Sequence, residues 1–266
     1  IEYRTITSIS PMTDEKSLDM NIEHEVGHNW LYGILATNER DFPWMDEGMN
    51  TFYDNRYEKL KYPENEDEGN NALSKKFPAD YSDLIYRMQI NAKKDQPIET
   101  VSADFSSTNY GAIAYYKTSL WMKKLQDLMG QNLFDSCMHE YYNRWKFKHP
   151  YPADFKKIME DVSGKNPDSI FSLLSKKGKL EPQEKKEFKA SFLFNLNKTD
   201  QYNYLFLSPA FGYNFYDKIM PGALIHNYTL PEPKFHGGGA PRYSTSSKTV
   251  NGIARIGYNI MSDGAV

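Results

Sequence analysis

The sequence predicts an α+β protein, with a mainly α-helical first part that has a short sheet at its edge and a β-rich C-terminal segment. Before residue 176, apolar residues recur at helical spacing through most of the chain. The charged stretch 176–186 interrupts this pattern. After it, apolar and other residues alternate, which indicates strands with one apolar face. The expected domains are therefore residues 1–178 and 187–266.

The expected elements of the first part follow from local signals. Residues 1–10 alternate like a strand, and Ser17 to Asn21 offers N-caps for the helix that follows. A second helix is expected over about 44–59, and the charged residues of 62–80 indicate a solvated loop. Further helical patterns, each bounded by proline, glycine or a capping residue, cover 83–91, 107–128, 133–145, 153–162 and 168–175.

The C-terminal segment has apolar residues on odd positions from Leu205 to Phe215 and on even positions from Val250 to Ile260. Long strands with one apolar side and many aromatics are typical of outer-membrane proteins, which need at least eight strands in a closed sheet. Roughly four strands fit here. A small soluble β-domain fits the pattern equally well. A third possibility is that a longer barrel-like segment was cut, and glycines 237–239 resemble a flexible joint or an engineered splice. The segment is therefore also a candidate for membrane association.

Composition indicates a globular protein with a sizeable core. The chain has 266 residues, of which 39% are hydrophobic. A net charge of -3 gives no reason to expect nucleic acid as a partner. Cys137 is the only cysteine of the sequence, so an internal disulfide is excluded. The sequence shows no apolar run long enough for a spanning helix and no signal segment, and without a starting Met it reads as a fragment.

The most informative motif is a pair of histidines followed by a carboxylate. Residues 24–28 read His-Glu-Val-Gly-His, and eighteen residues separate His28 from Glu47. Four residues turn a helix by about 400°, so His24 and His28 project from one face as two ligands of one metal. Glu47 is the expected third ligand, because two histidines, one carboxylate and an open water position form a common catalytic zinc site. Glu25 is the expected general base, and one Zn²⁺ per chain is the expected cofactor.

These residues resemble a known family of peptidases. The motif, the following Trp30 and the sequence Trp-Met-Asp-Glu-Gly at 44–48 are similar to those of the M1 family of zinc aminopeptidases, a gluzincin family. The resemblance spans about residues 1 to 175, as in a fragment of the catalytic domain. It implies a thermolysin-like, helix-rich lobe and peptide substrates.

The resemblance also implies a residue that stabilises the oxyanion of the reaction. Members of the family carry a Tyr-x-Lys-Gly motif on a later helix, whose tyrosine hydroxyl has this role. Here residues 115–118 read Tyr-Tyr-Lys-Thr, so Thr118 stands in place of the glycine. The resemblance implies Tyr115 as the catalytic tyrosine, with Tyr110 and Tyr116 as competitors.

A further implied residue binds the substrate's free α-amino group. Members of the family carry Gly-x-Met-Glu-Asn before the zinc helix, and its glutamate has this role. The chain begins Ile1-Glu2-Tyr3, and Glu2 lies twenty-two residues before His24. Glu2 is thus the implied substrate-binding residue, although the glycine is missing and Ile1 and Tyr3 replace Met and Asn.

The expected function is a zinc-dependent aminopeptidase that hydrolyses N-terminal residues from peptides with metal-activated water. One alternative is a related gluzincin endopeptidase. Two further alternatives are a metal-bearing but inactive binding module, and an envelope protein in which the β-segment carries the function and the zinc lobe is only a scaffold. The expected partners are peptide substrates, and the expected location is extracytoplasmic, in a bacterial periplasm or associated with the outer membrane.

Overall fold

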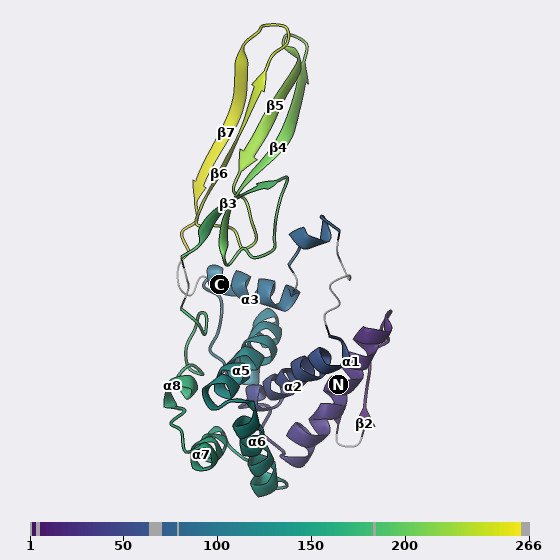
Figure 1. Ribbon diagram of the computed structural model, residues 1–266, viewed down its shortest axis with the longest axis vertical. Helices are drawn as coiled ribbons and strands as arrows, with labels where there is room; N and C mark the ends of the chain where they lie inside the picture. Colours follow the sequence, from purple (N-terminus) through teal and green to yellow (C-terminus); the bar gives the residue numbers. More distant parts are fainter. Residues whose placement is uncertain (1, 4–5, 64–70, 79, 183–184, 262–266) are drawn as a thin grey trace. The chain divides into compact units, whose positions relative to one another are not determined.

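The chain forms two compact units, one made of residues 1–65 and 95–180 and the other of 66–94 and 181–266. Figure 1 shows the computed structural model. It describes residues 2–3, 6–63, 71–78, 80–182 and 185–261, without the side chains of residues 2 and 3. The charged loop expected at 62–80 therefore lies partly outside the described residues.

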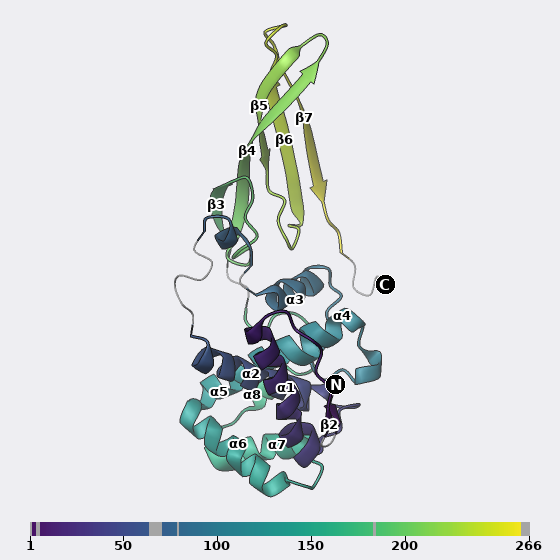
Figure 2. The same cartoon turned by 90° about the vertical axis from the view of Figure 1, so that its right-hand side faces the viewer.

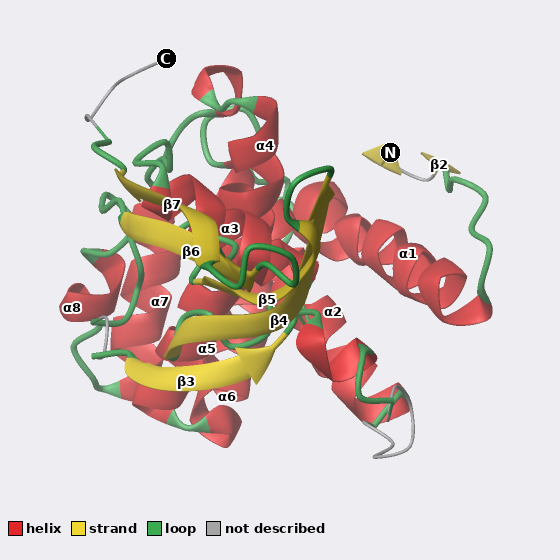
Figure 3. Ribbon diagram, turned by 90° about the horizontal axis from the view of Figure 1, so that it is seen from above, coloured by secondary structure: helices red, strands yellow, loops and turns green. Residues whose placement is uncertain are grey.

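The first unit is mainly helical, and Figure 3 separates its helices from strands by colour. Two short antiparallel strands form a small sheet at its N-terminus. Its elements are β1 (Glu2–Tyr3), β2 (Ile6–Thr7), α1 (Glu15–His28), the π-helix η1 (Asn29–Ile34), η2 (Pro43–Met45), α2 (Glu47–Lys61), η4 (Ser102–Asp104), α4 (Ser107–Asn109), the π-helix η5 (Tyr110–Lys117), α5 (Thr118–Met129), α6 (Gln131–Trp145), α7 (Pro152–Ser163) and α8 (Asp168–Phe171).

Helix α1 begins earlier than the sequence predicted. The Asp14 side chain caps it by accepting a hydrogen bond from the Ser17 backbone N–H, at 2.8 Å. The expectation of an N-cap between Ser17 and Asn21 is therefore wrong, because these residues lie inside the helix. The sequence offers capping residues at Thr13, Asp14, Ser17, Asp19 and Asn21, and Asp14 is the one that is used.

Aromatic side chains form the core of the first unit. Trp44 and Trp121 are fully buried and meet edge to face, with ring centroids 5.4 Å apart. Trp121 also contacts Phe171, at 5.1 Å, and its indole N–H donates to the Ile170 carbonyl, at 2.8 Å. These contacts join η2, which precedes the Glu47 helix, to α5 and α8.

The second unit combines one helix with a five-stranded sheet in the order β3-β4-β5-β6-β7. Strand β3 runs parallel to β4, and the other neighbours are antiparallel. The buried Arg87 of α3 donates from Nη1 to Thr199 Oγ1, at 2.8 Å, which attaches the helix to the segment before β4. Its elements are η3 (Ser74–Lys76), α3 (Tyr81–Asn91), β3 (Glu187–Phe192), β4 (Tyr202–Asn214), β5 (Lys218–His226), β6 (Phe235–Tyr243) and β7 (Val250–Tyr258).

The predicted α+β class is confirmed, with a helical part first and a β-rich segment after it. The unit of residues 66–94 and 181–266 was not evident from the sequence, because its two stretches are far apart in the chain. Within the described ranges, the helices are too short or too polar to cross a bilayer.

Candidate metal centre

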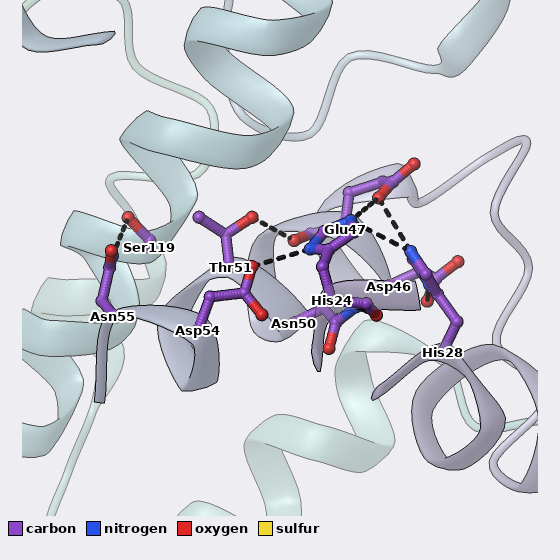
Figure 4. Close-up of polar contacts among 9 residues, drawn as sticks. All are labelled: His24, His28, Asp46, Glu47, Asn50, Thr51, Asp54, Asn55 and Ser119. Carbon is purple, nitrogen blue, oxygen red and sulfur yellow. Dashed lines mark hydrogen bonds and ion pairs between the residues drawn. The ribbon is translucent and has the colours of Figure 1, made fainter. Parts of the chain in front are cut away.

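His24, His28 and Glu47 point toward one another in the first unit (Figure 4). The two histidines come from the last turns of α1, and Glu47 is the first residue of α2. The two histidine Nε2 atoms are 3.2 Å apart. Glu47 Oε2 lies 3.4 Å from His24 Nε2 and 3.3 Å from His28 Nε2, so the three atoms form a nearly equilateral triangle.

Two glycines let the helices that carry these residues approach closely. A Cβ on Gly27 of α1 would lie 2.0 Å from Asn50 Oδ1, and one on Gly48 of α2 would lie 2.2 Å from Thr118 Cγ2. Asn50 also donates a hydrogen bond to the His24 carbonyl, at 2.6 Å. The motif glycines therefore bring α1, α2 and the start of α5 together, which fixes the distance between the histidines and Glu47.

Two aspartates orient the histidine rings from behind. Asp54 Oδ2 lies 2.7 Å from His24 Nδ1, and Asp46 Oδ1 lies 2.8 Å from His28 Nδ1. A carboxylate on Nδ1 holds the proton there and leaves Nε2 as the ligand atom, as is usual for metal-binding histidines. Both rings therefore present Nε2 to the centre of the triangle.

The donor set fits a zinc ion. Tetrahedral coordination with bonds of about 2.0–2.2 Å requires ligand atoms roughly 3.3–3.6 Å apart, close to the edges of this triangle. Glu47 Oε2 is buried and has no hydrogen-bond partner, although it faces both imidazoles. With their protons on Nδ1, His24 and His28 would also turn the lone pairs of their Nε2 atoms toward each other, which is unfavourable without a cation between them. A cation at the centre satisfies all three atoms, so this cluster could bind a metal.

The electrostatics of the cluster favour positive charge. Burial lowers the pKa of His24, but its contacts with Asp54 and Glu47 outweigh burial and raise the pKa to about 9. Burial also opposes protonation of His28, and Asp46 and Glu47 raise its pKa to about 10. Burial raises the pKa of Glu47, yet its contacts with the two histidines and Tyr115 lower the pKa to about 2. The site thus stabilises a cation at its centre.

Tyr115 lies beside the cluster. Its ring stacks on His24, with centroids 5.8 Å apart, and its side chain hydrogen-bonds Glu47. Tyr110 contacts the edge of Tyr115, with centroids 5.7 Å apart. Both tyrosines belong to η5, where the wider turn of a π-helix adds one residue and rotates the side chains after it. The structure therefore places Tyr115 next to the triangle and Tyr110 in contact with Tyr115.

The structure describes the side chain of Glu25 but not that of Glu2. Glu25 is buried on α1 between the two histidines. Among the described residues, the cluster with metal-ligand spacing consists of His24, His28 and Glu47, and Glu25 is outside it. Glu2 lies in β1, but its side chain is outside the described residues.

Asp46, Asn50 and Asp54 are site residues that sequence reasoning did not assign a role. Asn50 and Asp54 follow Glu47 by three and seven positions on α2, which places all three on one helix face. That spacing was the available signal. Asp46 lies within the recognised motif, and its role depends on the loop geometry before α2.

Comparison with known proteins identifies a family whose domain includes the residues of the cluster. The Peptidase family M1 domain matches residues 5–174. Glutamyl aminopeptidase of Bitis rhinoceros is 24% identical over 144 residues, which cover 54% of this chain and 15% of that protein. Leucine aminopeptidase 2 of Phaeosphaeria nodorum is 25% identical over 177 residues, which cover 63% of this chain and 26% of that protein. The chain thus spans a minor part of these relatives.

Solved structures of a metallopeptidase and an aminopeptidase are also similar. An M1 zinc metallopeptidase from Deinococcus radiodurans aligns with a TM-score of 0.44 and 12% identity, covering 64% of this chain and 36% of that one. Legionella pneumophila aminopeptidase A aligns with a TM-score of 0.42 and 13% identity, covering 90% of this chain and 24% of that one. The domain match covers more than half of the chain and includes every residue of the cluster. The chain therefore belongs to peptidase family M1.

Proposed function

We propose that the protein is a zinc-dependent aminopeptidase that removes N-terminal residues from peptides. The observation that carries the proposal is the triangle of His24 Nε2, His28 Nε2 and Glu47 Oε2, whose edges of 3.2–3.4 Å suit one tetrahedral ion. Membership of family M1 supports peptides as substrates. The names of the relatives, which are aminopeptidases, support action at the N-terminus.

Five residues of the site have a direct part in this reaction. His24, His28 and Glu47 would hold zinc, which supplies a Lewis acid and an activated water when bound. Glu25 takes the proton from the attacking water and passes it to the leaving amine. The Tyr115 hydroxyl, which already reaches the Glu47 carboxylate, donates a hydrogen bond to the developing oxyanion.

Selection for a free N-terminus is assigned to Glu2 in this proposal. A carboxylate at a fixed distance from the metal makes a charge-assisted hydrogen bond with the substrate ammonium. An N-acetylated peptide has no ammonium, so it should be a poor substrate. Equal cleavage of free and acetylated peptides by the full-length protein would favour an endopeptidase instead.

The experiment that tests the proposal compares Glu25→Gln with the unmodified full-length protein. Zinc content is measured by mass spectrometry, and turnover with a panel of aminoacyl reporter substrates. Glu25→Gln should keep its zinc, because Glu25 is not a ligand, and should lose about a hundredfold to ten-thousandfold in kcat. Glu15→Gln, at an exposed position of the same helix, is the matched control and should retain activity. Full turnover by zinc-loaded Glu25→Gln would overturn the mechanism.

A further inference from the structure

The antiparallel strands β4 to β7 carry one entirely apolar face. The pairs Ile225↔Gly239 and Gly239↔Ala254 show that odd positions of β5 and β6 share a face with even positions of β7. The pair Tyr213↔Ile219 adds the odd positions of β4. We define the apolar face as odd positions 205–213, 219–225 and 235–243 and even positions 250–258. Every residue at these positions is aliphatic, aromatic, proline or glycine.

The opposite face carries all the charged side chains and histidines of these four strands. They are Lys218, His226, His236, Arg242 and Arg255, from three different strands. The separation of apolar residues from charged residues and histidines follows the alternation of side chains in each of the four strands, so it is a property of the whole sheet.

The apolar face is open in the second unit. Phe211, Val250 and Ile256, from different parts of it, are 74%, 73% and 75% exposed. Monomeric proteins in water rarely expose an apolar patch larger than a few hundred Å². A face of this extent therefore indicates an apolar partner.

Two features of the face favour lipid over another protein. Strands β5, β6 and β7 have nine residues each, the length with which a tilted strand crosses the hydrocarbon layer of a bilayer. Aromatic residues lie toward both ends, with Tyr213 and Tyr243 at one end and the pair Phe235↔Tyr258 at the other. Aromatic residues at both edges of an uncharged band are typical of membrane strands, whereas protein interfaces have a polar rim.

Figure 2 labels strands β4 to β7. We propose that their apolar face contacts the acyl chains of a lipid bilayer, with these strands crossing the bilayer. In the described chain, β7 pairs on one side only, with β6. Water is absent from the hydrocarbon layer, so the free edge of β7 must pair there with a further strand. The sheet is thus part of a larger strand assembly in the membrane. This inference is independent of the peptidase proposal.

The test measures whether each face of the sheet contacts lipid. The complete chain carries a fluorescent label at Ile256→Cys or, as the matched control, at its neighbour Arg255→Cys on the opposite face. Leu207→Cys and Ser208→Cys form a second pair on β4. Cys137 is buried, and the unmodified chain treated with the label is the blank. The protein is reconstituted into vesicles of phosphatidylcholine and phosphatidylglycerol that contain a lipid with a nitroxide at mid-chain.

The labels at Ile256→Cys and Leu207→Cys should be quenched several-fold more strongly than those at Arg255→Cys and Ser208→Cys. Equal quenching of both faces, or no quenching, would overturn the proposal. So would a blue shift of the Ile256→Cys label in vesicle-free buffer that grows with protein concentration, since this would show that a second copy covers the face. As an independent check, Ile256→Asp should lower vesicle binding by on the order of tenfold or more, whereas Arg255→Asp should not.

Discussion

Asp54 and Asp46, which lie against the Nδ1 atoms of His24 and His28, are expected to raise the affinity of these histidines for a metal. Asp54→Asn keeps a hydrogen-bond acceptor near His24 Nδ1 but removes the negative charge that makes the imidazole a better ligand. We expect zinc affinity to fall about 10-fold to 100-fold, measured by competition with a chelator of known affinity. Asp135→Asn is the control, because Asp135 pairs with Arg56 and is outside the cluster. Unchanged affinity in Asp54→Asn would show that Asp54 does not support the ligand.

Tyr115 is expected to act on the transition state. Loss of one hydrogen-bond donor to an oxyanion costs on the order of a hundredfold to a thousandfold in kcat, with little change in ground-state binding. Tyr115→Phe should show this decrease in steady-state kinetics while KM and zinc content stay near those of the unmodified protein. Tyr116→Phe, the neighbouring substitution, should leave kcat unchanged. The reverse result would assign the oxyanion role to Tyr116.

At the residue scale, the sequence predicted the residues of the cluster because a helix fixes how His24 and His28 project. The structure brings Glu47 to them as expected, through contacts that depend on glycines at 27 and 48. Asp54 was not assigned a role, because its spacing from Glu47 indicates only a shared helix face, and the fold is needed to show that it contacts His24. The roles of Glu25, Tyr115 and Glu2 remain predictions.

At the element scale, the close approach of α2 to η5 and α5 determines the geometry of the centre. Gly48→Ala would place a Cβ 2.3 Å from Thr118 Cβ and 2.5 Å from the Ala114 carbonyl, so the helices must separate. We expect the free energy of unfolding to fall by about 1–3 kcal/mol in urea denaturation, together with a loss of zinc affinity. Gly111→Ala is the control, since a Cβ there meets no atom within 4 Å. Equal stability of the two variants would contradict tight packing at Gly48.

The π-helices explain why the helical spacing of apolar residues did not predict every element of the first unit. Residues 107–128 were expected to form one helix, and the structure has α4, η5 and α5 in this range. A π-turn inserts one residue without breaking the run of helical residues, so it changes the spacing of apolar residues too little to be predicted from the sequence. Its effect is on direction, because it decides which tyrosine of the segment faces the histidines.

Lys117, at the end of η5, makes stability depend on pH. Burial lowers its pKa from 10.5 to about 8, and Asp95 offsets this only in part. Between these values the unfolded chain holds a proton that the folded chain has released, so the free energy of unfolding should rise as pH increases from about 8 to 10.5. Lys117→Met should flatten this rise in denaturation curves taken across the range. Lys123→Met, at an exposed lysine of α5, should preserve it.

At the scale of the whole molecule, zinc should stabilise the folded protein. A ligand that binds only the folded state adds RT ln(1 + [L]/Kd), which is about 2.7 kcal/mol at a free concentration of 100 Kd. Removal of the metal with a chelator should therefore lower Tm, and added zinc should restore it. Glu47→Gln should show a smaller shift, because it removes the carboxylate from the triangle. An identical shift in this variant would place the stabilising zinc elsewhere.

The arrangement of the second unit has a consequence for biosynthesis. Helix α3 is translated about a hundred residues before Thr199, the partner of its buried Arg87. At roughly 5–20 residues per second, a ribosome needs on the order of 10 s to cover that distance. During this interval the guanidinium stays in water and α3 has no sheet to join. A chaperone that binds α3 on the nascent chain would have this interval in which to act, and it would lose its binding site when β4 emerges.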